Sequence, residues 1–319
     1  MSGDELLVLA RSRGTGASEW QWRTVPNGAT NLPSSYMPAG VPFHVACVPG
    51  KGFGLVASRR LQAGMRLLAE APLAYCNRVD EAEDANVLIR AAVGALDGPS
   101  RASYDALSQH GGPATKTVEG IWHSNALPAG GEGRMAAATY ALISRTNHSC
   151  RPNAHTAWNE KTGRQTLHAA QPIAEGDEIL ISYLEPGLTR DERRAQLRAR
   201  FGFKCACALC SLEGAALARS DARQRRISEI DAITDDGGDG TTAHPRMAEL
   251  VREKLELLVA EELPREWGHM DMACAFARCV VDGDVGQAKV WIRDAATSAR
   301  VLLGSDSPTV LGLEAYVRR

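Results

Sequence analysis

The sequence predicts an α+β protein in which short β-strands dominate the first two thirds of the chain and helices alone fill the last third. Segments rich in valine, leucine and aromatic residues, bounded by glycine and proline, recur between residues 42 and 183, as is typical of strands. From about Glu213 onward this pattern stops and helical periodicity replaces it. With 319 residues, 44% of them hydrophobic, the chain is long enough for one large domain or two ordinary ones. We therefore place the boundary between the two regions near residue 212.

The first 40 residues carry several glycine, asparagine and proline residues and little apolar periodicity. We expect residues 1–40 to form a weakly ordered arm, although Trp20 and Trp22 indicate that part of it docks elsewhere on the chain. The next segments are strand-like. They are PFHVACVP at 42–49, KGFGLVAS at 51–58 and MRLLAEAPLAYC at 65–76.

A helical insertion is expected at about 80–135. Acidic residues open the segment 80–96, which favours a helix there, a second short helix suits 101–109, and a glycine-rich loop lies at 130–133. Strand signals then return. Residues 155–173 predict a hairpin with its turn at Lys161–Gly163, and AEGDEILISY predicts a turn followed by a strand that ends at Tyr183.

The helix at 189–200 has clear boundary signals. Thr189 and Glu192 form a capping box, and Gly202 stands where a left-handed carboxyl-terminal cap belongs. Amphipathic helices separated by short polar turns follow, a pattern typical of α-solenoid repeats. We predict these helices at 215–233, 246–263, 270–281, 287–303 and 308–317.

Charge and composition limit the surroundings in which the protein works. The formal net charge of −2 provides no attraction toward nucleic acid or an anionic membrane, and no apolar run approaches the ~20 residues of a membrane helix. The start MSGDELLVLARSRG does not resemble a secretory signal, so the eight cysteines are expected to be thiols or metal ligands. The arginines of TRDERRAQLRAR alternate with acids, which indicates a solvated helix face. We expect a monomer in the nucleus, the cytoplasm or both, with no membrane or direct nucleic-acid binding.

Three cysteines stand close together in CACALC, namely Cys205, Cys207 and Cys210. Three thiolates on one turn make most of a tetrahedral zinc site, which needs a fourth ligand from elsewhere. Cys150 is the best candidate because its neighbours are polar and irregular, but spacing alone does not choose it over Cys47 or a histidine. The alternative is that the thiols cluster by chance as small buried side chains.

Four motifs occur in the order seen in SET-domain protein lysine methyltransferases. They are GFGL at 52–55, NHSCRPNA at 147–154, EGDEILISY at 175–183 and FGFKCACALC at 201–210. The chain most resembles the branch of the SET and MYND proteins and of fungal SET proteins with a helical carboxyl-terminal region. It departs from that branch in lacking the MYND zinc finger, since no cysteine lies between Cys76 and Cys150. The resemblance implies a SET domain at 41–184, a post-SET segment at 185–212 and a TPR-like region at 213–319.

The resemblance also implies two ligand sites. S-adenosylmethionine would be bound by the side chain of Asn147 and the backbone of His148, while Cys150 would complete a closed, structural zinc site. Further cofactor contacts are carried over by position. They are Lys51, Gly52, Phe53 and Gly54 in a glycine loop that lets the backbone approach the ligand, together with Asn125, Ser144, Tyr183 and Phe203.

For catalysis, Tyr183 matches the tyrosine whose hydroxyl orients the substrate amine. Phe203 and Phe201 would line the lysine channel, although ordinary core packing would also explain both. Methyl transfer to an amine is accelerated more by alignment of the two reactants and by exclusion of water from the channel than by acid–base groups. We therefore predict an S-adenosylmethionine-dependent methyltransferase that acts on lysine side chains of a protein substrate. The alternative is a non-catalytic SET-fold scaffold.

Overall fold

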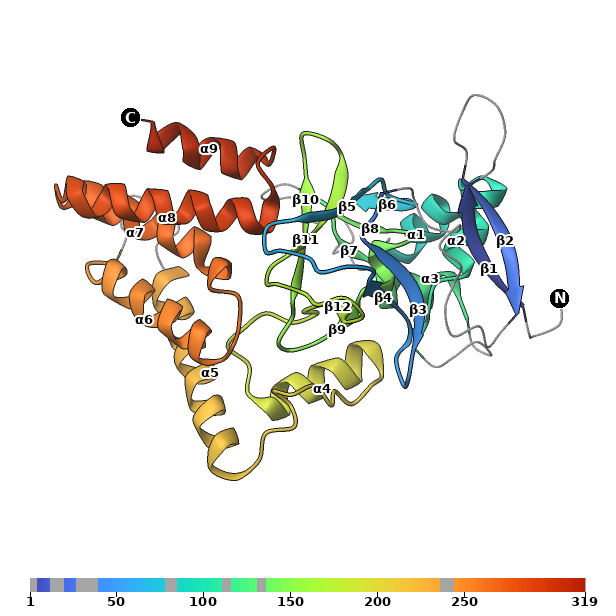
Figure 1. The fold of residues 1–319 in the computed structure, drawn as a ribbon, viewed down its shortest axis with the longest axis horizontal. Coiled ribbons are helices and arrows are strands. Elements are labelled where there is room, and N and C mark those ends of the chain that lie inside the picture. The colour runs from blue at the N-terminus through green and yellow to red at the C-terminus, as the bar shows by residue number, and fades with distance from the viewer. Residues whose placement is uncertain are drawn as a thin grey trace.

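The structure is a computed structural model that describes residues 5–11, 20–26, 40–77, 85–110, 116–130, 136–235 and 244–318. Figure 1 shows three groups of elements. The helices of the carboxyl-terminal region lie on one side, a set of small sheets lies in the centre, and short helices with a strand pair lie on the far side. Within the described residues the last strand ends at Ile181, so the predicted change from strands to helices is confirmed.

Near the amino terminus the structure contains a strand pair where the sequence predicted a weakly ordered arm. Strands β1 (Glu5–Arg11) and β2 (Trp20–Pro26) pair in antiparallel register, with Leu9 opposite Trp22. The pair lies beside helix α2 (Figure 1). Both strands are rich in residues that favour extended backbone, a signal that the loop residues around them concealed. The rest of residues 1–39 lies outside the described part of the chain.

Three small sheets make up the centre of the molecule. In hydrogen-bonded order, the first sheet contains β3 (Phe43–Val48), β4 (Gly52–Ala57), β12 (Glu178–Ile181) and β9 (Asn147–His148). The second contains β10 (Ala154–Asn159), β11 (Arg164–Ala169) and β5 (Arg66–Glu70). The third contains β6 (Ala74–Asn77), β8 (Ala136–Thr139) and β7 (Leu127–Pro128). Neighbouring strands are antiparallel, except that β9 and β12 run parallel. The predicted early strands and the hairpin with its turn after Asn159 are confirmed. The last strand ends two residues before Tyr183, whose N–H bonds the His148 ring instead of a strand.

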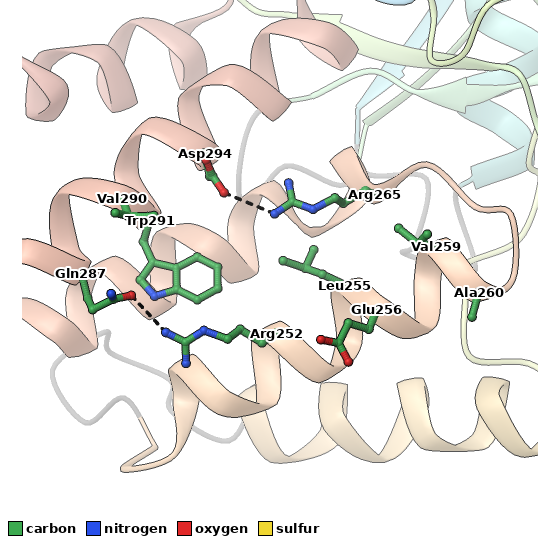
Figure 2. A pocket seen from close by; sticks show the side chains of 10 residues that line it. All are labelled: Arg252, Leu255, Glu256, Val259, Ala260, Arg265, Gln287, Val290, Trp291 and Asp294. Carbon is green, nitrogen blue, oxygen red and sulfur yellow. Dashed lines mark hydrogen bonds and ion pairs between the residues drawn. The ribbon is translucent and has the colours of Figure 1, made fainter.

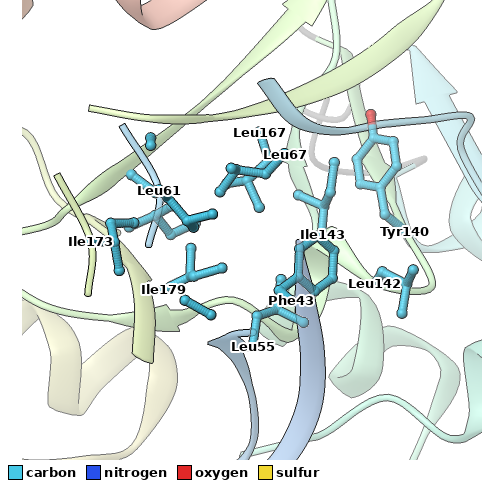
Figure 3. Close-up of a cluster of buried hydrophobic side chains, with 14 of the residues drawn as sticks. Phe43, Leu55, Leu61, Leu67, Tyr140, Leu142, Ile143, Leu167, Ile173 and Ile179 are labelled. Carbon is cyan, nitrogen blue, oxygen red and sulfur yellow. The ribbon is translucent and has the colours of Figure 1, made fainter. Parts of the chain in front are cut away.

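The first two sheets enclose one apolar core, shown in Figure 3. Alternate residues of a strand face the same side, so Phe43 and Val45 of β3 are buried together, as are Leu55 and Ala57 of β4. Other buried members come from β5, β11 and β12, from the loops and from the segment before β9. They include Leu61, Leu67, Ile143, Leu167, Ile173 and Ile179. This core fixes the ends of β4, β9 and β12, where the candidate site lies.

In its described residues the insertion contains three helices where the sequence predicted two. They are α1 (Ala85–Gly94), α2 (Gly98–Asp105) and α3 (Val118–Asn125). The first two overlap the predicted helices, whose acidic start at 80–84 lies outside the described residues. Helix α3 was missed, although Thr117 caps it through a bond from the Gly120 amide. It is only eight residues long, which is too short for helical periodicity to be detected from sequence.

The helices after residue 189 follow the predictions within a few residues, except that the short η4 lies in a predicted break between two helices. They are α4 (Arg190–Phe201), α5 (Gly214–Asp235), α6 (Met247–Ala260), the short η4 (Arg265–Gly268), α7 (His269–Val281), α8 (Val285–Leu303) and α9 (Pro308–Val317). The capping box of Thr189 and Glu192 and the left-handed Gly202, with φ of 72°, are both confirmed. Helix α8 packs between α7 and α9 and also touches β10 and β11.

A groove of about 480 Å³ lies along α6 and α8, shown in Figure 2. The Arg252 guanidinium lies over the Trp291 ring and donates to Gln287. Arg265 pairs with Asp294 across the groove. None of the residues that line it belongs to the SET motifs, so this groove is separate from the candidate site described below.

Polar contacts join the carboxyl-terminal helices to the SET motifs. Arg151, next to Cys150, donates to the backbone oxygen of Glu261 at 2.8 Å. The Glu261 side chain is fully buried and accepts hydrogen bonds from Ser220, Arg223 and Gln224 of α5. Gln224 in turn accepts from the Gly187 amide, just before α4. These bonds connect the motif, the segment before α4, helix α5 and the end of α6.

Replacing Glu261 by glutamine should therefore destabilise the fold. The substitution removes the charge that strengthens three buried hydrogen bonds, so we expect the free energy of unfolding to fall by about 1.5–3 kcal/mol. Urea unfolding followed by circular dichroism measures this change. Glu256→Gln, at an exposed position of the same helix, is the matched control and should change stability by less than about 0.5 kcal/mol. Equal stability of both variants and the parent would contradict the network's role.

Candidate active site and metal centre

Four cysteines come together beside the end of β9. Cys150 follows that strand, and Cys205, Cys207 and Cys210 lie in the loop after α4. Their sulfur atoms all lie within 4.8 Å of one another, and Cys150 Sγ is 3.9 Å from Cys205 Sγ and 3.6 Å from Cys210 Sγ. A tetrahedral zinc ion with Zn–S bonds of about 2.3 Å needs sulfurs about 3.8 Å apart. The donor set and spacing thus fit zinc, and the structure places Cys150 in the cluster and the exposed Cys47 outside it.

An arginine that the sequence analysis did not single out lies against this cluster. Arg193 of α4 is only 4% exposed, and its Nε and Nη2 atoms are buried without a hydrogen-bond partner among the described residues. Burial alone would lower the pKa of Arg193, but the nearby sulfurs of Cys150 and Cys210 raise it. Four thiolates around one zinc ion carry a net charge of about −2, so a buried cation beside them offsets part of that charge.

The side chain of His148 connects the metal centre to Tyr183. Its Nδ1 atom accepts a hydrogen bond from the Tyr183 N–H at 3.0 Å, and Nε2 lies 3.2 Å from Cys150 Sγ. Burial lowers the pKa of His148 to about 4, so the ring is neutral at physiological pH. Because Nδ1 accepts, the proton is on Nε2, which donates to the Cys150 sulfur. The ring is therefore fully engaged, and only the backbone of His148 is available to a ligand.

Asn147 and the glycine loop of β4 meet at a second point. The Asn147 side chain donates through Nδ2 to Glu178 Oε1 at 2.8 Å and to the Phe53 backbone oxygen at 3.4 Å. Lys51 donates to the other carboxylate oxygen of Glu178 at 2.6 Å. A Cβ atom on Gly54 would lie 2.8 Å from both Asn147 Nδ2 and Glu178 Oε1, so a side chain there would disrupt the contact.

The aromatic residues gather around Tyr183. The Tyr183 ring centroid is 4.8 Å from that of Phe201 and 5.1 Å from that of His148, and Phe203 is 6.0 Å from His148. The Tyr183 hydroxyl donates to the Thr146 backbone oxygen at 2.8 Å. Burial, and to a smaller extent the Glu178 carboxylate, raise the pKa of Tyr183, so its hydroxyl keeps its proton at neutral pH.

Asn125 and Ser144 contact each other. Ser144 donates to the Asn125 backbone oxygen at 2.9 Å and accepts from the Tyr140 amide. The Asn125 side chain is buried and donates to the backbone oxygens of Ser108 and Ile121. Its amide nitrogen is thus committed to holding the insertion, and only its carbonyl oxygen could serve a ligand.

Glu178 is the residue of this site that the sequence analysis missed, although it lies inside the quoted EGDEILISY motif. As the first residue of β12, its side chain lies on the side opposite the buried Ile179. A charged residue that begins a strand of otherwise apolar residues was the available signal. Its partners could not be anticipated, because Lys51 and Asn147 are 127 and 31 residues away in the sequence.

Comparison with known proteins gives a consistent result. The SET domain family model matches residues 52–184. The chain is 28% identical over 281 residues to histone-lysine N-methyltransferase set5 of Schizosaccharomyces pombe, covering 86% of this chain and 83% of that protein. It is also 28% identical over 171 residues to human histone-lysine N-methyltransferase SMYD3, covering 52% of this chain and 34% of that protein. With Arabidopsis thaliana ATXR4, also named a histone-lysine N-methyltransferase, it shares 36% identity over 80 residues, a quarter of each chain. In the described part of the chain, every helix is too short or too polar to cross a membrane.

The four-cysteine cluster predicts about one zinc ion per chain, as in closed four-thiolate sites. Elemental analysis of purified protein measures this ratio. Cys150→Ser should reduce the zinc content and the melting temperature, because metal binding and folding are coupled at such sites. Cys47→Ser, at an exposed cysteine outside the cluster, is the matched control and should keep its zinc. A wild-type protein that folds fully without metal would exclude the zinc site.

Proposed function

We propose that the chain is a SET-domain protein of the lysine methyltransferase family, and from this premise we derive how its residues bind the cofactor and orient the substrate. Its activity is the transfer of a methyl group to lysine side chains of a protein. The observation that carries the proposal is the junction at β9. Asn147, His148 and Tyr183 lie within one hydrogen-bonded unit beside the four cysteines.

In the proposed cofactor site, S-adenosylmethionine lies against the glycine loop of β4 and the β9 segment. When bound, it supplies the activated methyl group. Gly54 has no side chain that would push Asn147 away from Glu178. For the same reason, a ligand can approach the Gly54 backbone closely. Lys51 would meet the cofactor's carboxylate, and the His148 backbone would contact its adenine. Gly52, Phe53, Asn125, Ser144 and Phe203 would surround it.

We assign Tyr183 the role of orienting the amine. Because its hydroxyl donates to the Thr146 oxygen, its own oxygen keeps lone pairs that can accept a hydrogen bond from the incoming amine. With its pKa raised, Tyr183 does not act as a base. The lysine must therefore arrive as the neutral amine, its proton having been lost to solvent. Phe201, packed on the Tyr183 ring, and Phe203 would keep water from the channel.

The zinc ion would be structural. Four thiolates leave no open coordination position, so the metal would hold the loop after α4 against β9. The hydrogen bond from His148 to Cys150 would then fix the His148 ring, which in turn holds the Tyr183 amide in place. We propose that residues 41–184 form the SET domain, 185–212 the post-SET segment and 213–319 a TPR-like wall of the substrate cleft.

We propose a histone as the substrate, because the Schizosaccharomyces pombe relative that matches over 86% of this chain is named a histone-lysine N-methyltransferase. Such a substrate implies a protein of the nucleus or the cytoplasm. A non-catalytic scaffold would keep the fold without turnover, and the following test distinguishes the two.

Purified protein should transfer labelled methyl groups from S-adenosylmethionine to lysine in core histones. Tyr183→Phe removes only the hydroxyl that orients the amine, so turnover should fall at least about tenfold, equivalent to about 1.4 kcal/mol. Cofactor affinity, measured by calorimetry, should stay nearly unchanged. Full turnover in this variant would remove Tyr183 from the proposed role.

Asn147→Ala serves as the complementary variant. It should weaken cofactor binding by about 1.5–3 kcal/mol, the value of a hydrogen bond to a charged group, while the protein stays folded. If the wild-type protein binds the cofactor but methylates no protein in a complete cell extract, the scaffold alternative is correct.

The phenylalanine at position 201 predicts which product forms. Close relatives usually carry tyrosine here, so this channel lacks a hydroxyl that could restrict rotation of the amine. We expect the enzyme to add more than one methyl group, and Phe201→Tyr to shift products toward lower methylation states. Mass spectrometry of products at matched turnover measures the change. Identical product distributions would mean that Phe201 only packs against Tyr183.

A further inference from the structure

A carboxylate from a distant strand caps the turn that leads into β9. Glu70 is the last residue of β5, 72 residues before the turn. One of its carboxylate oxygens accepts from the Leu142 amide at 3.0 Å, and the other accepts from the Ile143 amide at 2.8 Å. These amides open the short 3₁₀ turn η3 (Ile143–Arg145).

The turn has no side-chain cap of its own. Leu142 occupies the capping position and cannot accept a hydrogen bond through its side chain. The first amides of a helical turn have no partner within the turn, and leaving them unpaired when buried is unfavourable. Leu142 and Ile143 are both buried. Glu70 therefore supplies the acceptors that the local sequence lacks.

This turn carries the groups that the proposed function uses. Its middle residue, Ser144, bonds the Asn125 backbone. The next residue after the turn, Thr146, offers the oxygen that accepts the Tyr183 hydroxyl. Asn147 comes immediately afterwards. A displacement of the turn would move both the hydroxyl acceptor and the Asn147 amide.

We infer that Glu70 is a positioning residue, whose ionised carboxylate holds the η3 turn so that Asn147 and Tyr183 take their places in the cofactor and amine sites. This inference rests on the proposed function. A neutral side chain at position 70 could not accept from both amides through two equivalent oxygens. The fold would persist, but the turn and the residues after it would lose their fixed position.

The surroundings of Glu70 allow this role to be read out by pH. Burial raises the pKa of Glu70 to about 7, opposed by the bonds from the turn amides and by the charge of Arg145. Tyr140 stays neutral because burial and the Glu70 charge raise its pKa, and Lys116 faces Arg145 from the insertion. From β11, Arg164 donates to the Ala69 oxygen, and the neutral Gln165 lies opposite Glu70.

Protonation of Glu70 affects the stability of the fold and the capping of the turn in opposite directions. A carboxyl group with a raised pKa in the folded state stabilises the fold when it is protonated, so this contribution is lost as pH rises through 7. The capping role requires the ionised form, so it is lost as pH falls through 7. A residue with only a structural role would change stability and cofactor affinity in the same direction.

The experiment measures binding of S-adenosylhomocysteine by calorimetry at pH 6, 7 and 8, with melting temperatures under the same conditions. For the wild-type protein, affinity should fall about tenfold from pH 8 to pH 6, as expected for one group that titrates near 7. The melting temperature of the wild-type protein, relative to that of Glu70→Gln, should rise as the pH falls from 8 to 6. Glu70→Gln should bind about tenfold more weakly at pH 8 and show no pH dependence. Glu175→Gln, at an exposed carboxylate in the turn before β12, should behave as the wild type.

Two outcomes overturn the inference. Wild-type affinity that is constant from pH 6 to pH 8 would do so even if Glu70→Gln fails to fold. Equal affinity of Glu70→Gln and the wild type at pH 8 would do so directly. Absence of any binding by the wild-type protein at pH 8 would instead contradict the proposed cofactor site, and it is distinguishable from both.

Discussion

The parallel pairing of β9 with β12 is the constraint on which the rest of the site depends. Two residues, Asn147 and His148, lie beside Leu180 and Ile181. A pair this short is weak by itself, so the surrounding polar groups must hold it. Asn153 does so twice, accepting from the Leu180 amide and donating to the Glu178 oxygen, and the Ser149 amide donates to Ile181. The segment 147–153 is rich in amide, imidazole and hydroxyl side chains. Its backbone is irregular and buried, so side chains within the segment must supply hydrogen-bond partners that a regular strand would find in its neighbour.

This constraint also explains why the proposed cofactor and metal sites are adjacent. His148 bonds both the Cys150 sulfur and the Tyr183 amide, while Asn147, one residue earlier, faces the glycine loop. Displacing either Asn147 or Cys150 would move the other, because the two residues are only three positions apart in the chain. Arg193 places a cation beside the thiols of the cysteine cluster. Glu178 places an anion beside Lys51, in the proposed cofactor site.

The carboxyl-terminal helices are attached at the same place. Arg151 reaches from the motif to the end of α6, and Arg66 of β5 pairs with Asp306 beyond α8. Gly304 makes room for the latter contact, because a Cβ atom there would overlap the Arg66 guanidinium and the His168 ring. The helical region is thus held against the sheets by buried or partly buried polar contacts. Its orientation relative to the site therefore depends on Arg66 and Arg151.

Much of this protein was determined by its sequence alone. The capping box at Thr189, the glycine that ends α4 and the turn of the β10–β11 hairpin are local signals, and they placed those elements correctly because a few adjacent residues decide them. Four motifs in order indicated a resemblance to SET-domain lysine methyltransferases, and Cys150 was chosen as the fourth thiol of the cluster that the structure forms. The strands β1 and β2 and the short helix α3 were not predicted, because their stability comes from pairing and packing that no short segment contains.

Only the tertiary structure decided which charged groups serve the site. Glu178 joins Lys51 to Asn147, Arg193 lies against the thiols, and Glu70 caps a turn that begins 72 residues later. Each residue resembles an ordinary surface acid or base in the sequence. Their roles arise because folding removes them from water and leaves one specific partner within hydrogen-bond distance, and that partner is set by the sheet topology and not by neighbours in the chain.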